Sequence, residues 1–216
     1  MRIKFEEQLE QLNVMLIDMG ALCEEAITYA VKAFNEGSDE MRQMTFDTDK
    51  VIDVREREIE NLCLKLLLQQ QPVARDLRLI SSALKMISDM ERIGDQAYDI
   101  AEITKTIEKN EDRVCEEHIA LMAETAVEMV TGSVDSFVKR DTDLANLVIS
   151  KDDRVDDLFI KVKDDLISMV TEDRSRGEYF VDILMIAKYL ERISDHAVNI
   201  AEWVIFSVTG KHVEEE

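Results

Sequence analysis

The sequence has little of what interrupts helices or cross-links chains. One proline and six glycines occur in 216 residues, so few positions are expected to break a helix. The three cysteines, Cys23, Cys63 and Cys115, are far apart and form no CxxC pair, which argues against a disulfide framework and against a thiolate metal site. We expect them to be small core residues in a reducing cytoplasm.

Long apolar runs and basic charge are also scarce. No stretch approaches the roughly 18 consecutive apolar residues of a membrane span, and the N-terminus has no apolar signal region. We therefore expect a cytoplasmic protein that reaches a membrane only through a partner. The formal net charge of -21 would repel a phosphate backbone, so nucleic acid is not an expected partner, whereas cations and basic protein surfaces are.

What is present is a helical pattern, with 46% apolar and 34% charged residues. Apolar residues at three- and four-residue steps predict helices over residues 3–35, 38–70, 73–109, 114–139 and 141–170, and a sixth that follows the polar stretch 172–177 and ends near Gly210. We expect Gly37 to end the first helix and Pro72 to lie in the first turn of the third. Ser38 or Asp39 should cap the second helix, and Asp141 the fifth.

The second half of the chain repeats the first. A shift of 103 residues superposes Met19 on Met122, Phe34 on Phe137 and Asp49 on Asp152, and a shift of 100 superposes residues 91–102 on residues 191–202. Long helices with short connections lie antiparallel. We therefore predict an all-α fold of two tandem three-helix bundles related by internal duplication, residues 1–110 and 111–216.

Each half carries two rows of acidic residues. At about 100° per residue, one row lies on a narrow face of the third and sixth helices: Glu91, Asp95, Asp99 and Glu102, and then Glu191, Asp195, Asn199 and Glu202. A second row lies on the preceding helix of each half: Asp49, Asp53 and Glu56, and then Asp152 and Asp156. Because these helices are neighbours in the chain, we expect four to six carboxylates to converge in each half.

Two interpretations of these rows stay open. The acids could form a solvated face or pair with Arg92 and Arg192, or they could bind cations. The rows continue an apolar stripe, and like charges four residues apart cost a helix about 0.2–0.5 kcal/mol per pair, so a repeated arrangement favours cations. Oxygen ligands without cysteine select hard ions such as Mg²⁺, Ca²⁺, Mn²⁺ or ferric iron, and carboxylates can bridge more than one ion.

Nothing in the sequence demands catalysis. The Glu-x-x-His pattern of di-iron proteins is missing, because His118 and His212 are far from the acidic motifs and His196 points off the acidic row. There is no glycine-rich phosphate loop, nucleophile elbow or catalytic triad. We expect a protein that is not an enzyme; a ferritin-like metal-dependent enzyme and a purely structural helical scaffold are the alternatives.

Four motifs stand out in the two halves: Gln70–Arg78, Glu91–Asp95, Glu191–His196 and Asn199–Val204. With them the chain resembles the PhoU family over essentially its whole length. The resemblance implies a cytoplasmic negative regulator of phosphate uptake and of phosphate-starvation (Pho regulon) signalling. It also implies an adaptor between the ATPase subunit of the phosphate ABC transporter and a sensor histidine kinase, and a homodimer.

The same resemblance implies metal ligands, and multinuclear iron clusters in some members. It carries over onto Asp49, Asp53, Glu91 and Asp95, and onto Asp152, Asp156, Glu191 and Asp195; the acidic rows add Glu56, Glu102, Asn199 and Glu202 as candidates. The expected cofactor is one or more divalent or trivalent ions held by carboxylates: iron, manganese, magnesium or zinc. Because Asp99 and Glu56 correspond to Asn199 and Phe159, we predict that the halves differ in metal number or affinity.

Overall fold

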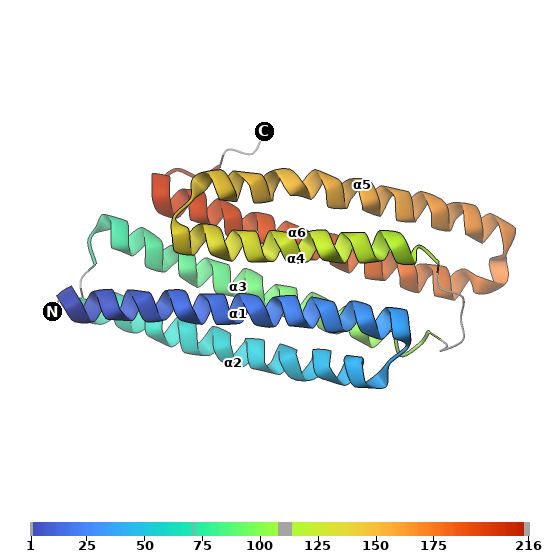
Figure 1. Cartoon of the computed structure of the whole chain (residues 1–216), viewed down its shortest axis with the longest axis horizontal. Coiled ribbons are helices and arrows are strands. Elements are labelled where there is room, and N and C mark those ends of the chain that lie inside the picture. The colour runs from blue at the N-terminus through green and yellow to red at the C-terminus, as the bar shows by residue number, and fades with distance from the viewer. Residues whose placement is uncertain (1, 71, 108–113, 214–216) are drawn as a thin grey trace.

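The computed structural model describes residues 2–70, 72–107 and 114–213. These residues form six long helices and one short 3-10 helix, and no strand is found among them (Figure 1). The elements are α1 (Arg2–Glu36), α2 (Asp39–Gln70), α3 (Ala74–Ile103), α4 (Glu116–Lys139), α5 (Thr142–Glu172), η1 (Arg174–Arg176) and α6 (Gly177–Thr209).

Three of the predicted capping residues, Gly37, Ser38 and Asp141, are confirmed at helix ends. Gly37 follows α1 in the left-handed conformation, with φ of 62°, which a residue without Cβ adopts at no steric cost. The Ser38 hydroxyl accepts a hydrogen bond from the Met41 N–H at 3.3 Å at the start of α2. The Asp141 carboxylate accepts from the Leu144 N–H at 3.0 Å and so caps α5.

The third helix differs from the prediction at both ends. Pro72 precedes the N-cap residue Val73 and so lies outside the first turn of α3. The helix ends at Ile103 rather than at residue 109, and residues 104–106 form a turn. Part of the predicted end, residues 108 and 109, lies outside the described residues.

The predicted all-α fold of two duplicated three-helix bundles is confirmed. Helices α1, α2 and α3 pack on one another, as do α4, α5 and α6, and Figure 1 shows the two bundles side by side. Met19 and Phe34 are fully buried in the first bundle, and their counterparts Met122 and Phe137 are buried in the second. Free Cys23 and free Cys63 are buried, as predicted, whereas free Cys115 is only partly buried.

The two bundles are joined mainly by α3 against α6 and by α1 against α4. On α3, Asp89 accepts a hydrogen bond from Asn199 of α6 at 3.2 Å. At the positions related by the duplication, the Tyr189 hydroxyl of α6 forms a hydrogen bond with Asp99 of α3. Position 89 thus meets position 199 and position 189 meets position 99, so the interface repeats the internal duplication as an approximate two-fold.

The helices bury an apolar core and leave a charged surface. Within the described part of the chain, none of them contains a stretch both long and apolar enough to cross a bilayer.

Candidate metal centres

The first acidic cluster lies where α2 crosses α3. The buried Ile52 side chain anchors α2 at this crossing, and Asp49 lies one turn earlier on the same face. A Cβ placed on Gly94 of α3 would lie 3.1 Å from Asp49 Oδ1 and 3.1 Å from Ile52 Cδ1. The absence of a side chain at Gly94 therefore lets the Asp49 carboxylate reach the α3 backbone.

Asp49 is the most perturbed acid of this cluster. Burial raises its pKa to about 6, and the negative charges of Asp53, Asp95 and Asp99 add to the rise. Its Oδ1 atom is buried and has no hydrogen-bond partner in the described structure. A buried carboxylate oxygen without a partner is costly, and both a proton and a cation would relieve it.

The other predicted acids of the first half lie close enough together to influence one another's pKa. Burial raises the pKa of Glu91, and the charges of Asp95, Glu56 and Asp53 contribute. Burial also raises the pKa of Glu56, with help from the nearby charges of Glu60 and Asp53. The structure thus brings the predicted residues of α2 and α3 together from both helices.

At the C-terminal end of the acidic row on α3, the structure differs from the predicted set of ligands. Burial and the charges of Asp95 and Glu102 raise the pKa of Asp99, while its hydrogen bond with Tyr189 opposes the rise. Glu102 is exposed and pairs with Lys105 at 2.9 Å. Asp99 therefore belongs to the first cluster, although the candidate set omitted it, and Glu102 lies at its edge.

The second cluster repeats this arrangement between α5 and α6. Burial raises the pKa of Asp152 to about 6, the charges of Asp156, Asp195 and Glu191 add to it, and the Ser194 hydroxyl opposes it. Asp152 Oδ1 is buried and, like its counterpart in the first half, lacks a hydrogen-bond partner in the described structure. Ser194 stands where the first half has Gly94, so the surroundings of Asp49 and Asp152 are similar but not identical.

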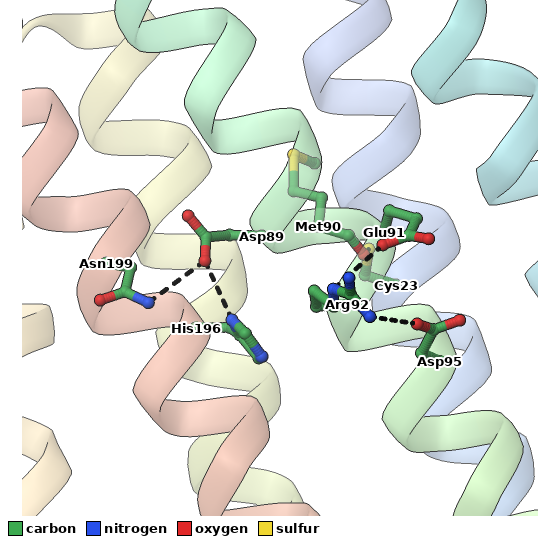
Figure 2. Close-up of polar contacts among 8 residues, drawn as sticks. All are labelled: Cys23, Asp89, Met90, Glu91, Arg92, Asp95, His196 and Asn199. Carbon is green, nitrogen blue, oxygen red and sulfur yellow. Dashed lines mark hydrogen bonds and ion pairs between the residues drawn. The ribbon is translucent and has the colours of Figure 1, made fainter.

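Asn199 and Glu202 lie beyond this second cluster along α6. The Asn199 amide donates to Asp89 of α3, and His196 Nδ1 lies 2.9 Å from the same Asp89 oxygen (Figure 2). Asn199 therefore faces the other half of the chain. Glu202 lies about one turn further and is partly buried. Asp89 was missed in the sequence because it lies off the acidic stripe and its partners come from the other half.

Basic side chains offset part of the negative charge. Arg92 lies 3.2 Å from Asp95 and 3.6 Å from Glu91, and its side chain is 60% exposed (Figure 2). Arg192 instead lies near Asp99 and lowers the pKa of that carboxyl. The predicted compensation by arginine is therefore real, although exposed ion pairs of this kind contribute little stability.

The donor chemistry of both clusters fits a hard cation, since every candidate donor is oxygen. The side chains are not gathered around a single point, however. Within residues 2–70, 72–107 and 114–213, no group of three or more Asp, Glu, His or Cys side chains is arranged to hold a metal ion. Binding would require carboxylates of neighbouring helices to rotate toward one another.

The chain is similar to known proteins along nearly its whole length. It matches the PhoU domain twice, at residues 16–104 and 119–204. It is 37% identical over 213 residues to a phosphate-specific transport system accessory protein PhoU homolog of Clostridium acetobutylicum, covering 97% of this chain and 96% of that protein. It is 36% identical over 190 residues to the homolog of Aquifex aeolicus, covering 88% and 86%.

Solved structures agree with the sequence matches. The crystal structure of PhoU from Pseudomonas aeruginosa superposes with a TM-score of 0.90 at 34% identity, covering 96% of this chain and 100% of that one. The phosphate transport system regulatory protein PhoU from Streptococcus pneumoniae gives a TM-score of 0.89 at 25% identity. With two domain matches, near-complete coverage and a shared fold, the chain belongs to the PhoU family.

Proposed function

We propose that this protein is a metal-binding regulator of phosphate transport without enzymatic activity. In this role it represses phosphate uptake and phosphate-starvation signalling from the cytoplasm, as an adaptor between the ATPase subunit of a phosphate ABC transporter and a sensor histidine kinase. The observation that carries the proposal is the near-complete match to proteins named phosphate-specific transport system accessory proteins. The two similar acidic clusters support the metal-binding part.

Each half would hold its ion between two helices. In the first half the ligands would come from Asp49, Asp53 and Glu56 of α2 and from Glu91 and Asp95 of α3. When bound, a hard cation supplies the positive charge that these carboxylates lack. The protein contributes by holding the two helices so close together that their carboxylates repel each other in the metal-free state.

In the second half, Asp152 and Asp156 of α5 and Glu191 and Asp195 of α6 would take the same role. Loss of repulsion on binding would draw α2 toward α3 and α5 toward α6. A partner that contacts both helices of such a pair would then distinguish the loaded from the metal-free state.

The metal-binding part is tested on the purified protein. After chelator treatment, the protein is titrated with Mn²⁺ and with ferrous iron, and bound metal is measured by elemental analysis. We expect saturable binding in both halves, lost from one half in Asp49→Ala/Asp53→Ala and from the other in Asp152→Ala/Asp156→Ala. Rapid turnover of ferrous iron with oxygen would favour the ferritin-like enzyme, and no binding at all would favour the structural scaffold.

The regulatory part is tested in the organism that encodes the protein. Deletion of the gene should release phosphate uptake and phosphate-starvation genes from repression while phosphate is abundant. Purified protein should be captured by the transporter ATPase subunit and by the cytoplasmic part of the kinase. Normal repression after deletion would contradict the proposal.

We also propose a homodimer. Large apolar side chains are exposed along α2 and α5, among them Val54 at 52%, Leu68 at 82% and Ile167 at 59%, and such surfaces suit self-association. Light scattering should give twice the chain mass of 24.9 kDa. A mass of one chain at micromolar concentration would contradict the dimer.

A further inference from the structure

The two acidic clusters differ at a pair of positions that face each other across the helix pair. In the first half these are Glu56 of α2 and Ser88 of α3. The shifts that superpose the halves, 103 and 100 residues, place Phe159 of α5 and Lys188 of α6 there instead. One half therefore has a carboxylate and a hydroxyl where the other has an aromatic ring and an ammonium.

In the second half the ammonium lies among the candidate ligands. Lys188 Nζ forms an ion pair with Glu191; the Glu191 side chain is 14% exposed and the Lys188 side chain is 42% exposed. The same nitrogen lies 5.4 Å from the centre of the Phe159 ring, within the range of a cation–π contact. Its charge also opposes the rise in the pKa of Asp156 and of Asp195, so it acts on acids of both helices.

In the first half the same positions have the opposite effect. The Ser88 hydroxyl bonds to Glu56, and the charge of Glu56 adds to the repulsion at Glu91. The basic side chain that pairs with Glu91 and Asp95 is Arg92, which is 60% exposed (Figure 2). Water screens the charge of Arg92 more than that of the less exposed Lys188, and the Arg92 side chain can turn away from the carboxylates.

We propose that Lys188 is a built-in counter-cation that makes the second cluster the weaker of two metal sites. This inference rests on the proposed metal binding. Between α5 and α6 a divalent ion would meet the positive charge of Lys188, which is already paired with Glu191, and the Phe159 ring would supply no donor. Between α2 and α3 such an ion would meet the additional carboxylate of Glu56, and the basic side chain paired with Glu91 and Asp95 is Arg92, which is 60% exposed against 42% for Lys188.

The experiment measures each acidic cluster separately in the full chain and then exchanges the residue types at positions 88 and 188. Asp49→Asn/Asp95→Asn leaves only the second cluster intact, and Asp152→Asn/Asp195→Asn leaves only the first. Mn²⁺ is titrated into each chelator-treated protein, and free Mn²⁺ is read from its electron paramagnetic resonance signal. We expect the dissociation constant of the second cluster to be about tenfold larger or more, the order expected for one added unit charge within several ångströms.

The decisive variants are Lys188→Ser and Ser88→Lys. Lys188→Ser, made where only the second cluster is intact, should tighten Mn²⁺ binding by about tenfold. Ser88→Lys, made where only the first is intact, should weaken it by a similar factor. The matched control is Lys161→Ser, since Lys161 is exposed on α5 about 180° around the helix from Asp152.

The outcomes separate the inference from the proposed function. Two clusters of equal affinity, both insensitive to position 188 or 88, would overturn the role of Lys188 and leave metal binding intact. An equal gain in Lys161→Ser would also overturn it, because net charge alone would then explain the effect. No Mn²⁺ binding by the wild-type protein, with helical content normal by circular dichroism, would overturn the proposed metal binding and this inference with it.

Discussion

Replacing Asp49 by asparagine should stabilise the protein without metal and weaken its response to metal. The pKa of Asp49 rises from 3.8 to about 6, which corresponds to about 3 kcal/mol for a group shielded from solvent. Because the side chain is half-buried, screening reduces this to about 1 kcal/mol. Asn has nearly the same shape and no charge, so Asp49→Asn in chelator at pH 7.5 should raise the Tm by about 2–4 °C.

With metal the sign should reverse. The measurement is made with Asp152→Asn/Asp195→Asn as the parent, so that only the first cluster responds. At a Mn²⁺ concentration of about 100 times the dissociation constant, one site adds about 2.7 kcal/mol to the free energy of unfolding. Asp49→Asn removes the charge and one oxygen of a proposed ligand, whose Oδ1 has no other partner in the described structure, so most of this gain should disappear.

The assay is thermal unfolding followed by circular dichroism, with chelator and with a Mn²⁺ series. Asp47→Asn is the control: Asp47 is exposed on the same helix, and hydrogen bonds from Lys50 and Gln43 lower its pKa. Its replacement should slightly destabilise the protein and leave the Mn²⁺ response unchanged. A loss of stability in chelator for Asp49→Asn, or an undiminished response to Mn²⁺, would refute the reasoning.

Three further predictions concern pH, capping and the contact between halves. The folded protein holds protons on Asp49 and Asp152 up to about pH 6, whereas the unfolded chain releases them near pH 4. Metal-free stability should therefore fall as pH rises through this window. The Tm should be higher at pH 5.5 than at pH 7.5, and Asp49→Asn/Asp152→Asn should flatten the difference. Asp141→Ala removes the cap of α5 and should cost about 1 kcal/mol in urea unfolding, whereas an unchanged midpoint would mean that the cap contributes nothing. Asp89→Ala removes the acceptor shared by His196 and Asn199 and should cost about 1–2 kcal/mol, with Mn²⁺ affinity unchanged; weaker Mn²⁺ binding would instead mean that Asp89 acts on the metal sites.

Much of the fold could be predicted because its determinants are local. The spacing of apolar residues predicted the six helices, and Gly37, Ser38 and Asp141 marked their ends through their own backbone and side-chain chemistry. The predicted end of α3 was wrong because the residues after Ile103 keep a helical composition, and composition alone does not decide where a helix stops. Pro72 was misplaced for a related reason, since its fixed φ suits both the first turn and the approach to it.

The candidate site was predictable only as far as one helix face determines it. Asp49 and Glu91 each lie near Asp53 and Asp95, because neighbouring helices of a bundle present the same faces to each other. Among the described residues these acids are nevertheless not arranged around a single point. Nothing in those faces placed Asn199 against Asp89, because that contact depends on how α3 crosses α6.

The sequence by itself determined the helices, the duplication and the four acidic rows, since each follows from the spacing of residues along one chain segment. Only the tertiary structure decided which acids lose their solvent. The pKa values of Asp49 and Asp152 are raised because the packing of two helices buries one carboxylate oxygen of each. Likewise, only packing placed Lys188 against Glu191 and Phe159, because the reach of an ammonium depends on which helix lies beside it.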